Sequence, residues 1–402
     1  MSKQRRRGSG EGLVRERADG RWEGRLSLGW EGGKRKTKSY FASTQAEVID
    51  KLLAARADHS HGLPIASKSQ TLGAFLDDWL MHSLKPRAKA RAFESFSTIA
   101  KKHIQPALGK IQLAKLTPQH IQRLLADKAK PGKDDQGNVT TKALSPASIT
   151  NIRTVLRSAL SQAVKFGLIA RNPAALVDAP RIPHKEVMPL DAAQANRLLE
   201  AAQCDRFEAV YVLALMLGMR RGEILGLRWS DVSLENRTLR ISQSLQRLRT
   251  DSEERGKKTQ LRATETKSDG SRRSIALPDS VVKVLKSHRA RQAEERLAAG
   301  AEWKDAMGLV FTTAAGSPIE PVILHREYKA LLDMAELPKT TRFHDLRHSA
   351  ASLLLAQGVP PKMIADLLGH SRIGITMDLY GHIMPAMRRE TADMMDLILG
   401  SR

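Results

Sequence analysis

Three short polar segments in the C-terminal half of the chain hold the residues whose types and spacing could do chemistry. They are residues 217–223, residues 343–349, and residues 367–371 together with 379–382. Arg220 and Glu223 are three residues apart, as are His344 and Arg347, so each pair shares one face of a helix. The second pair lies at a predicted helix N-terminus, where backbone amides favour an anion. These cations could therefore hold a phosphate group.

Tyr380 is the candidate nucleophile beside such a phosphate. Of the four tyrosines, Tyr40 lies in a predicted strand, and Tyr211 and Tyr328 lie in apolar or amphipathic stretches. Tyr380 alone lies among glycine, histidine and polar residues. A phenol with an ordinary pKa of about 10 is roughly 0.1% ionised at pH 7, so this hydroxyl needs cationic neighbours or a base. His344 is a candidate for that base.

Each motif taken alone is weak evidence. An arginine–glutamate pair at this spacing is usually a surface ion pair, and a single His-x-x-Arg carries little information. The sequence has no phosphate-binding loop, no His-Glu-x-x-His and no Gly-x-Ser-x-Gly. It also lacks a carboxylate cluster of the kind that holds catalytic metals. The absence of such a cluster agrees with chemistry that needs no metal.

Taken in order, the motifs resemble the active-site signature of the tyrosine recombinases, the family that includes the lambda-type phage integrases. The matching residues are Arg220, Lys267, His344, Arg347, His370 and Tyr380. The sequence motifs around these residues resemble those of the family too: Gly-Met-Arg-Arg-Gly-Glu, His-Asp-Leu-Arg-His-Ser, Leu-Leu-Gly-His-Ser and Tyr-Gly-His. Leu217 stands where many members carry threonine, which leaves the catalytic positions intact. For Lys267, the nearby Lys257, Lys258 and Arg262 are alternatives.

The resemblance implies a site-specific DNA recombinase, an integrase that cleaves and rejoins strands through a 3′-phosphotyrosine intermediate. Arg220 and Arg347 would hold the nonbridging phosphate oxygens, because guanidinium groups match phosphate geometry and stay charged. His370 would add a donor to the phosphate, and Lys267 would protonate the departing 5′ oxygen. Glu223 would orient its neighbours. The covalent bond conserves the energy of the phosphodiester, so no ATP is needed. The cations would do the work of a metal, so the resemblance implies neither a metal nor a cofactor.

The resemblance also implies the partners. Double-stranded attachment sites of a phage or mobile element would be the substrate, and a homotetramer would form in the synaptic complex. A host DNA-bending protein and a directionality factor would be further partners. The amphipathic residues 387–399 would dock on a neighbouring protomer, or else pack on their own domain.

Composition agrees with a nucleic-acid partner. The 402 residues carry 66 lysines and arginines against 43 acidic residues, a formal net charge of +23, which favours binding to a polyanion. We find no run of about 18 apolar residues that could span a bilayer and no signal peptide. The single cysteine excludes an intrachain disulfide. The expected location is the cytoplasm of a bacterial host, in association with the nucleoid.

The pattern predicts a mainly α multidomain fold. A small β-sheet-plus-helix domain over 1–60 resembles an arm-type DNA-binding domain, with strands at 21–30 and 34–41 and a helix at 44–57. A helical domain over 70–176 resembles the core-binding domain; Thr71, Thr117 and Ser145 precede its helices, and 128–142 is predicted to be a mobile loop. Residues 188–402 form the mixed, mostly α catalytic domain with a small sheet, including a hairpin that pairs 264–267 with 274–277.

The basic residues of the first domain are predicted to contact DNA from the open face of its sheet. They are Arg15, Arg17, Arg21, Arg25, Lys34, Arg35 and Lys36. The alternative is a solvated basic surface.

Three other functions remain open at this point. A type IB topoisomerase uses the same kinds of residue to nick and reseal one strand. A DNA-binding regulator could keep the scaffold without activity, although Tyr380 and both arginines are present. A polybasic membrane-surface protein would bind acidic liposomes more tightly than DNA.

Overall fold

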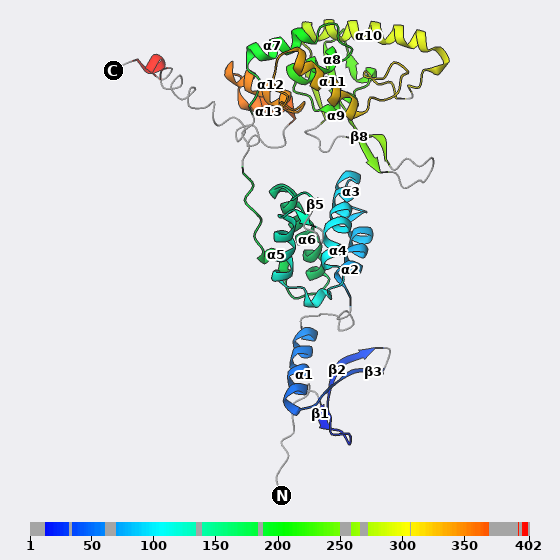
Figure 1. Ribbon diagram of the computed structural model, residues 1–402, viewed down its shortest axis with the longest axis vertical. Coiled ribbons are helices and arrows are strands. Elements are labelled where there is room, and N and C mark those ends of the chain that lie inside the picture. Colours follow the sequence, from blue (N-terminus) through cyan, green and yellow to red (C-terminus); the bar gives the residue numbers. More distant parts are fainter. Residues whose placement is uncertain are drawn as a thin grey trace. The chain divides into compact units, whose positions relative to one another are not determined.

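The computed structural model describes residues 13–31, 34–60, 70–133, 139–183, 188–249, 259–265, 272–305, 307–369, 393 and 396–400. The chain divides into two compact units, Met1–Pro183 and His184–Arg402, and each is described by itself (Figure 1). The predicted fold class, mainly helical with small antiparallel sheets, is confirmed. The division into three domains at 1–60, 70–176 and 188–402 stays a prediction.

A three-stranded antiparallel sheet packs on one helix in the N-terminal part. In sheet order the strands are β1 (Leu13–Glu16), β2 (Trp22–Glu31) and β3 (Lys34–Ala42), and the helix is α1 (Gln45–Ser60). Leu26 and Leu52 are buried between sheet and helix. A Cβ at Gly24 would come within 2.7 Å of Leu52 Cδ1, so glycine lets α1 approach β2 closely. The two predicted strands and the helix are confirmed; β1 was not predicted.

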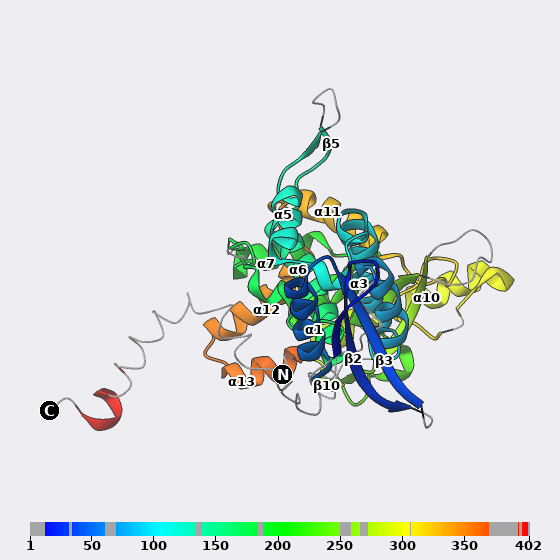
Figure 2. The same ribbon diagram turned by 90° about the horizontal axis from the view of Figure 1, so that it is seen from below.

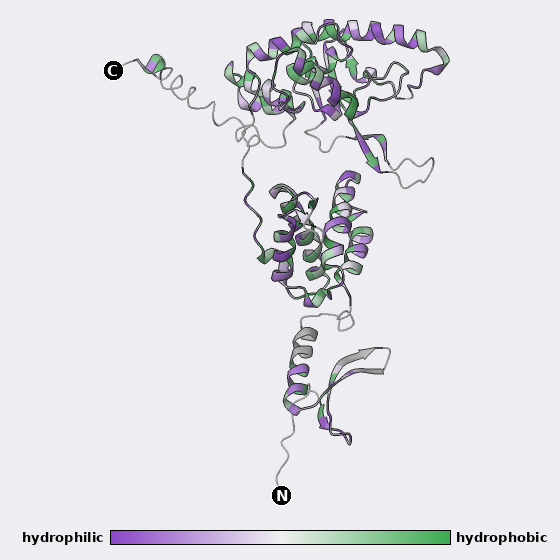
Figure 3. Ribbon diagram, in the orientation of Figure 1, coloured by the Kyte–Doolittle hydropathy of each residue, from purple (hydrophilic) through white to green (hydrophobic). Residues whose placement is uncertain are grey.

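The following part is a helical bundle with its own hydrophobic core. Its helices are α2 (Leu72–Asp78), α3 (Ala90–Ile99), α4 (Gln105–Leu108), α5 (Pro118–Lys128) and α6 (Pro146–Lys165). π-helical segments at Trp79–Leu84 and Ala100–Ile104 continue α2 and α3, and short 3-10 helices lie at Leu113–Lys115 and Pro173–Leu176. The side chains of Thr71, Thr117 and Ser145 accept hydrogen bonds from the first turns of α2, α5 and α6, which confirms the predicted helix starts. Figure 3 shows hydrophobic and hydrophilic residues alternating along these helices, and the buried apolar residues of α2, α5 and α6 form the core.

The predicted loop at 128–142 is wrong in one respect. Two short strands, β4 (Gly132–Lys133) and β5 (Val139–Thr141), pair there and extend beyond the helices as a narrow ribbon (Figure 2). The sequence pattern did not predict this pairing, because strands of two or three residues are too short to show an alternation of apolar and polar residues.

The second unit wraps helices around one apolar helix. Its helices are α7 (Ala192–Ala201), α8 (Glu208–Met216), α9 (Arg221–Leu225), α10 (Asp279–Ala299), α11 (Pro321–Met334), α12 (Asp345–Ala356) and α13 (Pro361–Leu368), with short turns at Trp229–Asp231 and Gly300–Glu302. Residues 209–215 of α8 are all buried, as expected of a helix that is apolar on every side. α8 contacts α7, α9, α10 and α12, so it holds in place the segments that carry the candidate site.

The strands of this unit form two separate antiparallel sheets. The neighbouring strands in residues 238–249 belong one to each sheet. The strands are β6 (Val232–Ser233), β7 (Thr238–Ile241), β8 (Gln243–Arg249), β9 (Thr259–Glu265) and β10 (Arg273–Ala276). β9 pairs with β8, and β10 pairs with β7. The predicted hairpin is therefore wrong: Thr264 lies opposite Ser244, and Ser274 lies opposite Arg240. The Asp-Gly turn signal at 269–270 falls between two strands that both pair with the 238–249 stretch, not between partners.

Candidate active site

Arg220 is held at the start of α9 by close packing of this helix on β8. A Cβ at Gly222 would lie 2.4 Å from Ser244 Oγ, and one at Gly226 would lie 2.8 Å from the Leu245 amide nitrogen. Glycine at both positions lets the helix lie directly on the strand. Arg220 precedes the first turn, and its side chain is 37% exposed. Among the described arginines of the site, Arg220 is the one most exposed to a ligand.

Glu223 joins Arg220 to a second arginine, Arg273 on β10. Its carboxylate accepts from Arg220 Nη1 at 2.7 Å and from Arg273 Nη2 at 3.1 Å, and it caps the helix by accepting from the Arg220 amide at 3.1 Å. Burial by itself would raise the pKa of this 4% exposed carboxyl, but the two guanidinium groups outweigh it and lower the pKa. Glu223 is therefore ionised and bonds to both arginines, and its contact with Arg220 agrees with their three-residue spacing in the sequence.

Arg347 lies on the first turn of α12 and is 3% exposed. Its Nη1 donates to the Gly218 carbonyl at 2.7 Å, and its Nη2 donates to the Leu368 carbonyl at 2.5 Å. Arg220 Nη2 donates to the next carbonyl, that of Gly369, at 3.2 Å. The two predicted phosphate-binding arginines therefore meet at the C-terminal end of α13.

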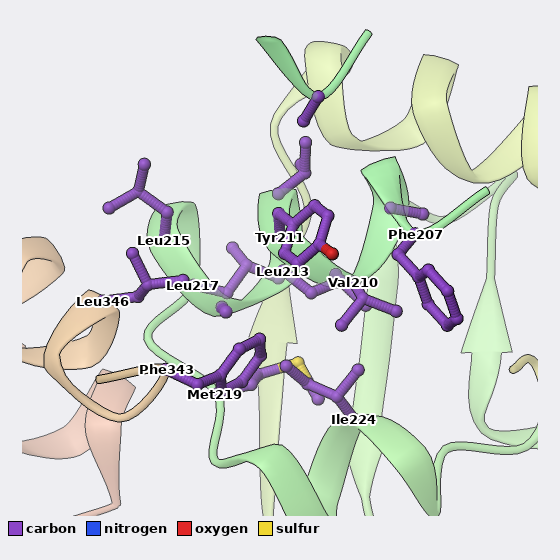
Figure 4. Packing of buried hydrophobic residues seen from close by; sticks show 14 of the residues in the cluster. Phe207, Val210, Tyr211, Leu213, Leu215, Leu217, Met219, Ile224, Phe343 and Leu346 are labelled. Carbon is purple, nitrogen blue, oxygen red and sulfur yellow. The ribbon is translucent and has the colours of Figure 1, made fainter. Parts of the chain in front are cut away.

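The chain turns sharply at Gly218, between α8 and α9. Gly218 has φ of +60°, and a Cβ there would lie 2.2 Å from Leu368 Cδ2. Figure 4 shows the neighbouring Leu217 and Met219 packed among the side chains of the core, with Leu346 and Phe343 beside them. The predicted interruption of the helix at Gly218 is confirmed, and the tight turn brings its carbonyl to Arg347.

Gly218→Ala is expected to destabilise the protein by about 1–3 kcal/mol more than Gly358→Ala. Both glycines have positive φ, so each alanine meets left-handed backbone strain of about 1–2 kcal/mol. Only at Gly218 does the new methyl group also collide with a neighbour, since nothing lies within 4 Å of the Cβ position at Gly358. Urea unfolding of both variants checks this expectation, and equal losses would contradict it.

His344 directly precedes α12, with its ring 5.4 Å from that of His348. The ring keeps contact with solvent. Partial burial, His348 and the positive charges of Arg347 and Arg220 lower its pKa to about 4. The direction of this shift leaves the imidazole uncharged at neutral pH, in the form that can accept a proton.

The sequence analysis missed Arg273. A signal for it exists: Ile275 and Leu277 are buried and Ser274 and Ala276 exposed, so period-two alternation places residue 273 on the inward face of the strand. An arginine on the inward face of a strand predicts a buried ion pair with an acidic residue elsewhere in the chain. In the structure this acidic residue is Glu223.

Three of the four tyrosines have buried hydroxyls. Tyr211 and Tyr328 are 0% exposed, their rings lie 6.0 Å apart in the core, and burial raises the pKa of both. The hydroxyls of Tyr40, Tyr211 and Tyr328 have no hydrogen-bond partner among the described residues. None of these three can reach a DNA phosphate, whereas Tyr380 lies outside the described residues.

Four of the seven predicted N-terminal DNA contacts form ion pairs with two carboxylates. Arg15 and Arg25 pair with Glu23, and Arg17 and Arg21 pair with Asp19. Hydrogen bonds from Arg15, Ser39 and Arg25 lower the pKa of Glu23 to about 2. Four arginines against two carboxylates leave two positive charges in excess on this face. The side chains of Lys34, Arg35 and Lys36 are outside what the structure describes.

Lys267, His370 and Tyr380 also lie outside the described residues, as does most of the predicted tail at 387–399. In sequence, Lys267 follows β9 closely and His370 directly follows Gly369. Within the described ranges, no group of three or more histidine, cysteine or carboxylate side chains could hold a metal ion. None of the helices described is both long enough and apolar enough to cross a membrane.

Comparison with known protein families and relatives identifies the family of the chain. Residues 189–387 match the model of the phage integrase family, and residues 71–128 match the N-terminal SAM-like domain of phage integrases. An integrase of Streptomyces ambofaciens is 32% identical over 94% of this chain and 94% of its own length. A XerC-like tyrosine recombinase of Caldanaerobacter subterraneus is 28% identical over 91% of this chain and 93% of its own length.

Solved structures agree with the fold. The integrase of transposon Tn1549, solved in complex with transposon right-end DNA, matches with a TM-score of 0.64 at 21% identity, covering 79% of this chain and 99% of that one. A lambda integrase dimer bound to a core site covers 94% of this chain and 96% of that one, with a TM-score of 0.53 at 18% identity. Relatives of this kind do not favour the topoisomerase alternative. The chain therefore belongs to the phage integrase family of tyrosine recombinases, and it is a site-specific DNA recombinase.

Proposed function

We propose that this recombinase cleaves attachment-site DNA of a phage or mobile element with Tyr380 as the nucleophile. The observation that carries the assignment is the burial of the hydroxyls of Tyr40, Tyr211 and Tyr328, which leaves Tyr380 as the phenol that can meet a phosphate. The Tyr380 oxygen attacks the scissile phosphorus and forms a 3′-phosphotyrosine, while the P–O bond to the 5′ oxygen breaks. Lys267 supplies the proton that the leaving oxygen takes up.

Arg220, Arg347 and His370 stabilise the charge that develops on the nonbridging oxygens. The meeting of Arg220 and Arg347 at the carbonyls of residues 368 and 369 supports this role, because His370 directly follows them. His344, uncharged at neutral pH, is available to accept the proton of Tyr380. Glu223 holds Arg220 in place.

The test traps the intermediate and identifies the linked residue. Duplexes from the DNA that flanks the gene, nicked near each candidate crossover point, are incubated with the protein in EDTA. The SDS-resistant adduct is digested with nuclease and trypsin. We expect a nucleotide on the tryptic peptide 373–388, whose one tyrosine is Tyr380. A nucleotide on any other peptide, or an adduct that forms only with a divalent metal, contradicts the assignment.

We further propose that the N-terminal sheet contacts arm-type sites through its open face. Arg15, Glu23 and Phe41 lie in register across the three strands, opposite the face that packs on α1. Replacing Arg17 and Arg21 by serine is expected to weaken arm-site binding and to reduce the slope of log K against log salt by about 2. Lys51→Gln, on α1, serves as control. An unchanged slope in the double variant contradicts this proposal.

Exchange between two duplexes would use four protomers, with residues 387–399 docked between neighbours. A host DNA-bending protein and a directionality factor would complete the complex on the bacterial chromosome. The sedimentation mass of the complex on two attachment sites tests the stoichiometry: four chains are expected, and a complex that completes exchange with two contradicts it.

A further inference from the structure

We infer that Arg273 is a positioning residue of the recombination reaction: it aligns Arg220 through Glu223 and fixes the main chain that leads to His370. This inference rests on the proposed function. It concerns a residue of β10 that lies 53 positions from Arg220 in sequence and meets it through one shared carboxylate.

Arg273 works inside the protein, not on DNA. Its side chain is 7% exposed, against 37% for Arg220. Its two terminal nitrogens both donate to Glu223, Nη2 to Oε2 at 3.1 Å and Nη1 to Oε1 at 3.4 Å. Because Nε donates to the Leu367 carbonyl as well, every nitrogen of this guanidinium is bonded within the protein.

The shared carboxylate makes the two arginines depend on one another. Glu223 is 4% exposed, so its charge has to be matched by groups within the protein. Arg273 is the buried positive charge that balances Glu223 within the protein. Without it, Arg220 would be the remaining ion-pair partner of Glu223 among the described residues, and Glu223 would draw it inward, away from the direction in which a phosphate arrives.

Arg273 also holds the end of α13. Its Nε donates to the Leu367 carbonyl at 2.6 Å. The carbonyls of Leu367, Leu368 and Gly369 therefore bind three different arginines in turn: Arg273, Arg347 and Arg220. Gly369 ends the helix with φ of +66°, and residue 370 comes next. The carbonyls at a helix end are otherwise unsatisfied, so the arginines determine where this end lies.

Lysine cannot replace Arg273 in both contacts. An ammonium is a point charge without the planar fork that spans two carboxylate oxygens while a third nitrogen reaches a carbonyl. Arg273→Lys thus keeps the charge beside Glu223 but breaks the geometry. A residue that merely balanced charge would tolerate this change.

The experiment compares Arg273→Lys, Arg220→Lys and the double variant with the wild type on the nicked attachment-site duplex. Covalent adduct formation at saturating DNA, DNA affinity and the melting temperature are measured for each. We expect Arg273→Lys to slow cleavage by roughly 10- to 100-fold, the range found for groups that orient metal ligands. DNA affinity should change by less than about threefold, and the double variant should lose less than the product of the two single losses, because part of the Arg273 effect acts through Arg220.

Arg206→Lys is the matched control for the loss of a partly buried arginine. Arg206 also pairs with a glutamate, Glu295, and donates to a main-chain carbonyl, that of Thr312. These contacts join α10 to the core and include no residue of the candidate site. We expect the variant to lower the melting temperature and leave the rate of adduct formation unchanged.

Four results would overturn the inference: cleavage by Arg273→Lys at the wild-type rate, independent and multiplying losses in the double variant, a cleavage loss matched by an equal loss of affinity, or an equal slowing in Arg206→Lys. If Arg273→Lys does not fold, Glu223→Gln replaces it in the same comparison, with the same expected dependence on Arg220. A failure of the proposed function is distinguishable, because the wild type would then form no adduct on Tyr380.

Discussion

Tyr380→Phe is expected to bind attachment-site DNA as tightly as the wild type and to form no covalent adduct. The substitution removes one oxygen, and that oxygen is the atom proposed to attack phosphorus. The three tyrosines that the structure describes cannot take its place, because the hydroxyls of Tyr40, Tyr211 and Tyr328 are buried. Adduct formation on the nicked duplex in EDTA should fall below detection, at least about 10³-fold, since nothing else supplies a nucleophile.

The chain offers two matched controls for this variant. Tyr211→Phe and Tyr328→Phe remove hydroxyls that have no hydrogen-bond partner in the described part of the chain. A buried hydroxyl without a partner costs free energy, so its removal should leave stability unchanged or raise it slightly. Both variants should form adduct at the wild-type rate. Residual adduct in Tyr380→Phe, or loss of adduct in either control, would show that the nucleophile is assigned wrongly.

The sequence predicted most elements of the fold because their signals are local. Thr71, Thr117 and Ser145 mark the starts of three helices, and each side chain accepts a hydrogen bond from a backbone amide in the first turn. The apolar run of α8 and the break at Gly218 were visible for the same reason. The error at the 264–277 hairpin shows the limit of local signals. A turn dipeptide gives the place where a strand can end, but the partner of each strand is set by packing far along the chain.

The candidate site divides in the same way. The Arg220–Glu223 pair follows from helical spacing and was predicted. Its link to Arg273, and the three carbonyls that bind Arg273, Arg347 and Arg220, join segments that lie up to about 150 residues apart. No period in the sequence reports which carbonyl an arginine will reach. Burial of Arg347 was likewise not predicted, because the sequence pattern suggested an open phosphate-binding group.

Arg347→Lys is expected to slow cleavage at saturating DNA by about 10²- to 10³-fold, the loss typical when a donor to developing charge is removed. Lysine keeps the charge but has no planar group that can donate to both the Gly218 and the Leu368 carbonyls and keep further N–H groups for a phosphate. The same change leaves at least one buried carbonyl unpaired, which costs about 1–3 kcal/mol of stability. Adduct kinetics and urea unfolding separate the two effects.

Ser349→Ala is the control that distinguishes a lost phosphate donor from a weakened α12. Ser349 is 0% exposed on the same helix, and its hydroxyl accepts from the Leu190 amide at 2.8 Å. Its loss should destabilise the protein to a similar degree, because a buried amide is left unpaired. Its hydroxyl bonds to the Leu190 amide and the Asp345 carbonyl, neither of which belongs to Arg220, Gly218 or the end of α13, so the cleavage rate per folded molecule should stay at the wild-type value. If both variants slow cleavage equally, Arg347 acts only by stabilising the helix, and the phosphate must then be held by Arg220 and by residues other than Arg347.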